Sequence, residues 1–336
     1  MSRLVYVEEA VRDHPRTRAI LGRLRGATVV PCARYGEVFN PRRQSFRLQK
    51  RRPALILAAK HGDPVLPVPS GYGLGADHDY YVSHVLNCPY DCRYCFLQGM
   101  YRSAHQVVFV TFEELAAAID RARERHAGET VCFFSGYDGD SLALEGVTGF
   151  AEFALDLFAA RPDAWLELRT KSARTRELLA RDPLPNVIVA YSLSPANVAR
   201  ALEHGAPSLE RRLSALSRVA AHGWLVGLRF DPLIHHQGFR ASYDELFDRV
   251  LARVPAAAIH SVTCGAFRLP APFFRRLRDL YPEEPLFSGP LEGRGDGLVT
   301  YRAELEAELL RYCRRRLEEL VPAGKLFVAA VQEEVA

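Results

Sequence analysis

The stretch NCPYDCRYCFLQ, residues 87–98, contains three cysteines, Cys88, Cys92 and Cys95, at the spacing C-x3-C-x2-C. Three thiolates on one short loop can bind three irons of a [4Fe–4S] cluster, which leaves the fourth iron open to a small molecule. A zinc site normally has four protein ligands, or three and a catalytic water, and no histidine in this stretch completes such a set. The spacing therefore favours an iron–sulfur cluster over a zinc site or buried structural cysteines.

From residue 81 onward, apolar runs alternate with amphipathic stretches. The runs predict strands at 81–86, 130–135, 164–170, 186–192, 224–230 and 258–264. Several are almost continuously apolar, as expected of parallel strands covered on both faces. The stretches between and after them predict helices at 111–126, 149–161, 208–223, 242–254 and 271–281. Six such units predict an α/β fold, a partial (β/α)6 barrel, with its active site at the C-terminal ends of the strands.

The regions on either side of this barrel have a different pattern. Residues 1–80 predict an N-terminal α/β region, with strands at 4–8, 27–31 and 53–60, a helix near 14–25 and a Pro/Gly-rich connection at 64–75. Residues 286–336 predict a C-terminal hairpin at 290–301 and a helix at 301–320. We therefore expect three parts: the N-terminal region, the barrel at 81–285 and the C-terminal segment.

Composition excludes several classes of protein. A chain of 336 residues with 48% hydrophobic and 25% charged residues is neither disordered nor a small disulfide scaffold. The N-terminal sequence MSRLVYVEEA places acidic residues where a signal peptide needs an apolar region. No apolar run reaches the roughly 18 residues of a membrane helix. We therefore expect a cytoplasmic protein without a membrane partner.

Charge is distributed unevenly along the chain. Residues 1–52 carry 13 Lys/Arg against 4 Asp/Glu, a net charge of +9, whereas the remainder carries a net charge of −5. The segment PRRQSFRLQKRR, 41–52, has six basic residues, no acidic residue and one aromatic, Phe46. A basic segment beside an aromatic side chain suits a nucleic acid, whose phosphates it neutralises and whose bases stack. A solvated surface segment that keeps the protein soluble is the alternative explanation.

The cysteine stretch and its setting resemble the radical S-adenosylmethionine (SAM) enzymes, which prefer an aromatic residue such as Tyr94 before the third cysteine. Collinear segments extend the resemblance to the spore photoproduct lyase family over nearly the whole chain. These segments are RLVYVEEAVRDHP (3–15), SGYDGDSLALE (135–145), LRTKS (168–172), YSLSP (191–195), the stretches 204–224 and 228–247, and AFRLP (266–270).

This resemblance implies a function and its cofactors. It implies a [4Fe–4S] cluster and SAM, an electron donor such as flavodoxin or ferredoxin, and a DNA substrate. In that family the reduced cluster cleaves SAM, and the resulting 5′-deoxyadenosyl radical abstracts hydrogen from a methyl-bridged thymine dimer. The bridge then breaks, a cysteine returns a hydrogen and SAM is regenerated. We accordingly expect radical chemistry on nucleic acid, with a DNA thymine lesion as the candidate substrate.

The resemblance also assigns residues to the SAM site. Lys171 aligns with a lysine that contacts the SAM carboxylate, and an ammonium at the end of a parallel strand is well placed for an anion. Ser192 and Ser194 are candidates to hydrogen-bond the amino-acid end of SAM, or alternatively to satisfy backbone groups near Pro195. Tyr94 is expected to pack by the adenine and to serve in hydrogen transfer.

The sequence departs from the family at the site of hydrogen return. The lesion-repairing members have a donor cysteine in a segment like S-C-T-S-D, where this chain reads SGYDGD at 135–140. Cys132 comes earlier and is expected to be buried in its strand. Tyr137 is the candidate donor in its place. Phe96 replaces a second tyrosine of the family's radical relay.

The predicted hairpin 290–301 resembles the one with which the lyases approach DNA. Arg294 matches an arginine there, which makes it the candidate for substrate binding, but Gly295 stands where an aromatic is expected. Two other functions stay open. One is a radical SAM enzyme that acts on a small molecule or modified RNA without splitting a lesion. The other is a nucleic-acid-binding protein with a structural cluster, which would not cleave SAM.

Overall fold

The structure, a computed structural model of the chain, describes residues 3–69 and 73–328. Side chains that alternate along strand β9 (Ala164–Thr170) show how its central sheet is built. Leu166 and Leu168 are buried in the main apolar core, together with side chains of the surrounding helices. Glu167 and Arg169 point to the opposite face, because successive strand residues alternate in direction. One face of the sheet is therefore apolar, and the other carries buried charges.

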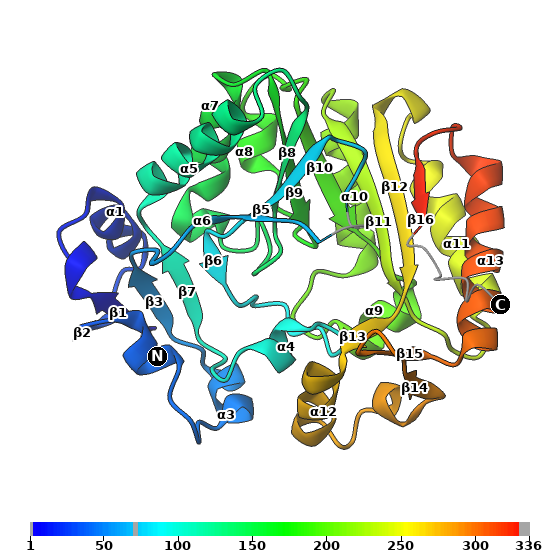
Figure 1. The fold of residues 1–336 in the computed structure, drawn as a ribbon, viewed down its shortest axis with the longest axis horizontal. Helices are drawn as coiled ribbons and strands as arrows, with labels where there is room; N and C mark the ends of the chain where they lie inside the picture. The colour runs from blue at the N-terminus through cyan, green and yellow to red at the C-terminus, as the bar shows by residue number, and fades with distance from the viewer. Residues whose placement is uncertain (1–2, 70–72, 329–336) are drawn as a thin grey trace.

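This central sheet curls into a half-barrel (Figure 1). Its strand order is β16-β12-β11-β10-β9-β8-β5-β4, and neighbours are parallel except β4 and β5. Besides β9, its strands are β4 (Val65–Pro67), β5 (His78–Val82), β8 (Val131–Ser135), β10 (Val187–Ser192), β11 (Leu225–Leu233), β12 (Ile259–Ala266) and β16 (Leu326–Val328). The arrangement confirms the predicted partial barrel.

Helices cover the outer, apolar face of this sheet (Figure 1). They are α5 (Phe112–Arg125), α7 (Phe150–Ala159), α10 (Leu209–Ala221), α11 (Phe239–Leu251) and α13 (Ala303–Leu320). Each contributes buried residues to the main core, such as Leu155, Leu216 and Leu309. Their positions confirm the predicted alternation of strands and helices.

A second sheet lies at the N-terminal side and has the order β2-β1-β3-β7-β6. Its strands are β1 (Leu4–Glu8), β2 (Thr28–Cys32), β3 (Leu55–Ala58), β6 (Val85–Leu86) and β7 (Gln106–Phe109). Strands β1, β2, β3 and β7 pair in parallel, and β6 is antiparallel to β7. The sheet thus takes two strands from beyond residue 80, and β7 was not predicted.

The prediction of a single strand over 81–86 is wrong. Strand β5 ends at Val82 in the half-barrel, and β6 begins at Val85 in the N-terminal sheet. Ser83 and His84 make the crossing: the Ser83 hydroxyl donates to Asp138 at 2.5 Å, and the buried His84 ring stacks on Phe150 at 3.5 Å. The chain therefore passes from one sheet to the other just before the cysteines.

A third, small sheet and several further helices complete the part of the chain that the structure describes. A small antiparallel sheet has the order β13-β15-β14, with β13 (Arg268–Pro270), β14 (Leu291–Gly293) and β15 (Leu298–Tyr301), which confirms the predicted hairpin. The other helices are α1 (Pro15–Arg23), α2 (Tyr35–Phe39), α3 (Phe46–Arg51), α4 (Leu97–Met100), α6 (Glu145–Thr148), α8 (Arg176–Leu179), α9 (Ala196–Leu202) and α12 (Ala271–Leu280). Among the described residues, no helix is long and apolar enough to cross a membrane.

Candidate active site

Two residues in left-handed conformations shape the cysteine loop, which lies between β6 and α4 (Figure 1). Asn87 has φ 69° and Asp91 has φ 47°, a conformation that Asn and Asp tolerate better than other side chains. The Asn87 amide donates to the backbone oxygens of Ser103 at 2.7 Å and His105 at 2.8 Å. These contacts fix the start of the loop, so that Cys88 follows directly on an ordered turn.

The middle of the loop is bound to the end of α9. The Arg93 N–H donates to the Leu202 oxygen at 2.8 Å, and the Gly205 N–H donates to the Tyr90 oxygen at 2.9 Å. A Cβ at Gly205 would lie 2.7 Å from the Pro89 oxygen, so only glycine fits this approach. The cysteine loop is therefore attached to the segment that follows β10.

The end of the loop is bound to α12. The Gln98 amide donates to the Cys92 oxygen and accepts from the Tyr281 hydroxyl, the latter at 2.6 Å. The Arg93 guanidinium lies 4.0 Å from the centre of the Tyr281 ring. Together with the contacts to α9, these interactions hold the loop from two sides.

The three thiols lie close enough to influence one another. Burial raises the pKa of Cys88, Cys92 and Cys95, and the charges of neighbouring thiolates raise the pKa of Cys88 and Cys92 further. Three thiolates are therefore stable together only beside compensating positive charge. Lys171 supplies part of it, because it lowers the pKa of Cys92 and Cys95. Cationic irons would supply the rest, so this donor set fits a [4Fe–4S] cluster.

Lys171 follows the C-terminal end of β9 and reaches the cysteine loop. Its Nζ lies 5.5 Å from the centre of the Tyr94 ring. Burial alone would lower the pKa of Lys171, but the nearby Cys92 thiolate and Glu203 carboxylate outweigh it and raise that pKa. The structure therefore holds a charged ammonium next to two of the three thiols.

Asp140, which the sequence analysis did not single out, fixes the backbone at Lys171. One carboxylate oxygen accepts from the N–H groups of Leu142 and Ala143 and from the Thr170 hydroxyl, at 3.0, 2.9 and 2.7 Å. The other accepts from the Lys171 N–H at 2.6 Å. This buried carboxylate thus ties the loop after β8 to the end of β9. An aspartate directly after a glycine at a strand end was the available signal.

Glu203 was also missed, and it joins most of the predicted SAM-site residues. Its Oε1 accepts from the Tyr94 hydroxyl and, at 3.0 Å, from the Ser194 hydroxyl, while its Oε2 accepts from the Arg212 guanidinium. Arg212 also donates to the Ser192 backbone oxygen at 3.0 Å. Burial alone would raise the pKa of Glu203, but Lys171 and Arg212 lower it, so the carboxylate is charged.

A signal for this buried pair lay in the sequence of α10. Arg212 falls on the same helical face as Leu209, Leu213 and Leu216, which are all buried. An arginine on an apolar face requires a buried acceptor, because an unpaired buried charge is strongly destabilising. Nothing in the local sequence identifies Glu203 as that acceptor.

Tyr137 lies in the loop after β8 and faces the cysteine loop. Its ring stacks on Tyr81 with 4.0 Å between centres and lies 5.1 Å from the Phe96 ring. Tyr137 is 38% exposed to solvent. Asp138, next to it, accepts from the hydroxyls of Ser83 and Tyr101. The loop is therefore well anchored, with the Tyr137 ring at the rim of the site.

No side chain is readily accommodated at Gly136. Its φ of +106° is unfavourable for other residues, and a Cβ there would lie 2.8 Å from the Arg169 oxygen. Cys132 is buried in β8, as expected, and burial raises its thiol pKa well above the ordinary value. Among the described residues of this loop, Tyr137 is therefore the one whose side chain takes the rim position.

In the basic segment 41–52, the structure contradicts the prediction for Phe46. Phe46 is buried, with Lys50 lying 5.5 Å over its ring, so the proposed use of Phe46 for stacking bases is wrong. The physical reason is that α3 is short and needs an apolar anchor. Its other bases divide into two groups. Arg47 and Lys50 pair with Glu283 and Asp91, whereas four arginines are exposed and make no ion pair with a described residue: Arg42, Arg43, Arg51 and Arg52.

Arg294 sits in the turn of the β14–β15 hairpin and contacts two carboxylates. Its guanidinium lies 2.7 Å from Asp296 and 3.4 Å from Glu306. Any contact with a phosphate would have to compete with these ion pairs. The structure thus places Arg294 on the predicted hairpin and away from the cluster of residues around Glu203.

Comparisons with known proteins give one family. A family model described as spore photoproduct lyase matches residues 76–283. The spore photoproduct lyase of Bacillus subtilis (strain 168) is 24% identical over 257 residues, which cover 74% of this chain and 75% of that protein. That of Geobacillus sp. (strain Y412MC61) is 23% identical over 257 residues, with the same coverage.

The fold has close counterparts among solved structures. A spore photoproduct lyase variant with bound AdoMet and dinucleoside spore photoproduct has a TM-score of 0.84 and 20% sequence identity, covering 98% of both chains. A spore photoproduct lyase complexed with dinucleoside spore photoproduct has a TM-score of 0.83 at the same identity and coverage. The half-barrel and the flanking sheets are therefore shared with these proteins.

Proposed function

The chain belongs to the spore photoproduct lyase family, and on this premise we propose that it is a radical SAM enzyme acting on a DNA thymine lesion. The observation that carries the proposal is the three-thiol loop, which lies beside Lys171 at the C-terminal ends of the strands. A [4Fe–4S] cluster with SAM supplies reductive cleavage of a sulfonium bond and, from it, a 5′-deoxyadenosyl radical. The protein binds and orients these groups and excludes water.

The residues around Glu203 fit the binding of SAM. We assign Cys88, Cys92 and Cys95 to the cluster and the Lys171 ammonium to the SAM carboxylate. The Tyr94 ring, held by its hydrogen bond to Glu203, offers an apolar face for the adenine. The Ser194 hydroxyl already donates to the Glu203 carboxylate. The Ser192 hydroxyl is therefore the candidate donor to the amino-acid end of SAM.

The aromatic side chains at the rim fit a nucleobase. We assign the stacked rings of Tyr81 and Tyr137 and the neighbouring, tilted ring of Phe96 to contact with one thymine of the lesion, because base–aromatic stacking is favourable and tolerant of sequence. The Tyr137 hydroxyl takes the role of hydrogen donor that a cysteine has in the relatives. After that transfer Tyr137 is a phenoxyl radical, and an external donor such as flavodoxin or ferredoxin returns one electron, with a proton from solvent.

The exposed arginines of the basic segment fit the DNA backbone. Arg42, Arg43 and Arg52 lie before and after α3, and Arg51 is its last residue. This helix contacts the cysteine loop through the Lys50–Asp91 ion pair of 3.4 Å. Arg102, in the segment after α4, and Arg276, on α12, add positive charge nearby; burial and the charge of Arg102 both lower the Arg276 pKa. Phosphates bound at this surface would bring the lesion toward the rim. Arg294 joins them by exchanging one of its carboxylates for a phosphate.

One experiment tests the proposal as a whole. Anaerobically reconstituted protein is reduced with dithionite and incubated with SAM and an oligonucleotide that contains spore photoproduct. Mass spectrometry is expected to show 5′-deoxyadenosine and restored thymines. The matched control replaces all three cluster cysteines by alanine and is expected to yield neither. Undiminished SAM cleavage by that control would overturn the assignment of the cluster.

A second candidate function rests on Gly136. Gly136 stands where the family's donor cysteine is expected, and its backbone conformation disfavours a larger side chain. Radical chemistry on a small molecule or modified RNA without lesion splitting follows as the alternative. In the same experiment, this alternative predicts 5′-deoxyadenosine with an RNA or small-molecule substrate and unchanged lesion DNA.

A further inference from the structure

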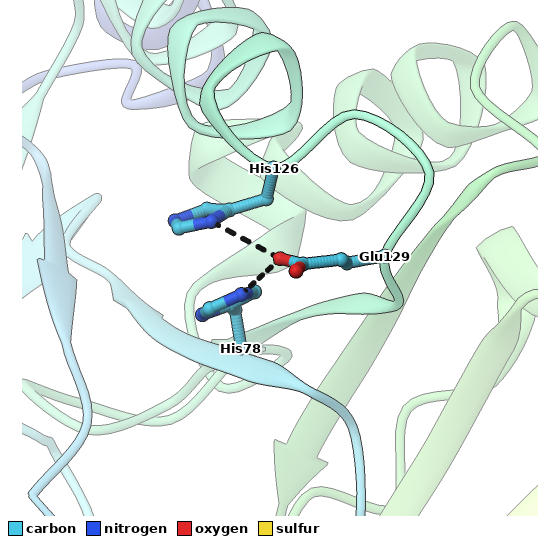
Figure 2. Close-up of side chains that lie close together, drawn as sticks. All are labelled: His78, His126 and Glu129. Carbon is cyan, nitrogen blue, oxygen red and sulfur yellow. Dashed lines mark hydrogen bonds and ion pairs between the residues drawn. The ribbon is translucent and has the colours of Figure 1, made fainter.

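A group of metal-binding side chains lies at the end of the half-barrel away from the cysteine loop. His78 is the first residue of β5, His126 follows the last residue of α5, and Glu129 lies just before β8. Figure 2 shows both imidazoles pointing toward the Glu129 carboxylate from opposite sides. The rings stack with 3.5 Å between their centres and an angle of 20° between their planes. Three potential ligand groups thus converge from three chain segments.

We propose that His78, His126 and Glu129 bind a divalent transition-metal ion of the zinc class. The candidate ligand atoms, one from each residue, all lie within 4.8 Å of one another. Two ligands bound at about 2.1 Å to one tetrahedral zinc lie roughly 3.4 Å apart. The Nδ1 of His126 is already 3.5 Å from the Glu129 Oε2, which is the separation such an ion requires.

The Nε2 of His78 is closer to the same Glu129 oxygen, so the carboxylate must withdraw slightly when an ion enters. It is free to do so, because the Glu129 side chain is 54% exposed and extends from a loop. Two imidazole nitrogens and one carboxylate oxygen suit zinc, and the exposed side leaves a fourth position for water. Mg²⁺ and Ca²⁺ are disfavoured because they prefer oxygen ligands.

Groups around the ligands hold them in position. The Tyr80 hydroxyl contacts the Nε2 of His126 at 2.7 Å, which orients the ring and directs its Nδ1 toward the shared oxygen. Asp77 and Thr130, the neighbours of His78 and Glu129, form a reciprocal pair. The Asp77 N–H donates to the Thr130 hydroxyl at 3.1 Å, and the Thr130 N–H donates to the Asp77 carboxylate at 2.8 Å. The two ligand-bearing loops are therefore joined without the ion.

The lone pair of each ring nitrogen lies in the plane of its ring, so at least one of the two stacked imidazoles has to turn before both nitrogens can face the same ion. A divalent ion then accepts one nitrogen lone pair from each ring and offsets the Glu129 charge. Bound there, it would link the start of β5 to the start of β8; these strands are paired, with His78 opposite Val131. Its role would be structural.

The test uses the full-length protein with its iron–sulfur cluster reconstituted. The protein is incubated with zinc sulfate and dialysed anaerobically, and zinc and iron are then counted by mass spectrometry. We expect one retained zinc per chain and an unchanged iron content. X-ray absorption at the zinc edge is expected to show nitrogen and oxygen ligands. Sulfur ligands would place the zinc on the cluster cysteines and overturn the proposal.

Variants locate the site. His78→Gln and Glu129→Gln are each expected to weaken zinc binding by at least about tenfold and to abolish the rise in melting temperature that zinc causes. His222→Gln is the matched control, since His222 is an exposed histidine that contacts the Arg181 oxygen on another side of the molecule. Unchanged iron content and circular dichroism show that each variant folds. Zinc affinity equal to that of the parent in both ligand variants would overturn the proposal, as would absence of bound zinc in the parent.

Discussion

Gly136 shows how a single backbone conformation constrains the chemistry of the rim. Its φ is positive, and a Cβ there would be 2.8 Å from the Arg169 oxygen. We expect Gly136→Cys to lower the free energy of unfolding by about 1–3 kcal/mol, because the variant must hold a strained conformation. Anaerobic chemical denaturation measures this loss. An equally stable Gly136→Cys protein would show that the loop adapts at no cost.

Tyr137 carries the corresponding prediction for the reaction. Its exposed ring lies beside Phe96, whereas the Cys132 thiol is buried in β8. We expect Tyr137→Phe to increase the by-products formed from lesion DNA, because the substrate radical loses its hydrogen donor. Tyr137→Cys is expected to reduce them. Product analysis by mass spectrometry decides the matter, and Cys132→Ala, the matched control, should leave the product distribution unchanged. The reverse pattern would assign the donor to Cys132.

Lys171 is one of four lysines in the chain and provides a test of SAM binding. Lys171→Ala is expected to weaken SAM binding about 10- to 100-fold, because a charge-assisted hydrogen bond contributes roughly 1.5–3 kcal/mol. Iron content should be unchanged. Equilibrium dialysis with labelled SAM gives the affinity, with Lys325→Ala as the control, because Lys325 donates to the backbone oxygens of Ala256 and Ile259 at the start of β12. Parent-like affinity in Lys171→Ala would remove this residue from the SAM site.

At the scale of elements, the Glu203–Arg212 ion pair joins the end of α9 to α10 and, through Tyr94, to the cysteine loop. Both side chains are fully buried. Glu203→Gln leaves the Arg212 charge without its partner, so we expect a loss of about 3–5 kcal/mol in unfolding free energy at neutral pH. Glu210→Gln, on the exposed face of α10, is the control and should lower the unfolding free energy by less than about 1 kcal/mol.

This prediction includes a pH dependence. The pKa of Glu203 is lower in the folded protein than its ordinary value, because Lys171 and Arg212 outweigh the effect of burial. The stabilisation is therefore present at neutral pH and is lost as pH falls below about 4.3 toward the folded pKa. Denaturation of parent and Glu203→Gln at several pH values should show their difference shrinking in acid. A constant difference would contradict a charged Glu203.

The α3 region provides the prediction for DNA. Replacing Arg42, Arg43, Arg51 and Arg52 by alanine is expected to weaken oligonucleotide binding and to flatten its dependence on salt. The slope of log affinity against log salt should fall by about 0.9 for each phosphate contact removed from duplex DNA. Fluorescence anisotropy over a range of salt concentrations measures it. Arg121 and Arg125 on α5 serve as controls. An unchanged slope would place the DNA surface elsewhere.

The bounds of the strands show what could be predicted from sequence patterns. Strands β9 and β10 were predicted within one residue of their ends because their apolar runs are bounded by polar residues and turns. The run 81–86 was not, because the polar pair Ser83–His84 inside YVSHVL does not by itself reveal that the chain changes sheets there. Phe46 was misread for a related reason: composition shows that an aromatic lies among bases, but only packing shows that it is buried.

At the scale of the whole molecule, the active site could be predicted only in part. The three cysteines are adjacent in sequence, so their spacing identified them. An arginine on the apolar face of α10 indicates a buried acceptor, but no local pattern identifies Glu203 as the partner of Arg212 or Lys171 as the contact of Asp140, because these residues are far apart in the sequence. The His78 group escaped notice for the same reason, since His78 and His126 are separated by the cysteine loop and all of α5.

The N-terminal sheet has a consequence for how this protein can change over generations. Strand β3 is paired with β7 over Leu55–Ala58 and Gln106–Phe109, and every residue of both strands is buried. A larger side chain in one strand therefore has to be compensated in the other. Recombination at residue 80 would combine β3 from one ancestor with β7 from another, and the buried side chains of the two strands would then not fit together. The first 80 residues are accordingly expected to be inherited together with the segment 85–109, so that β3 and β7 covary among descendants.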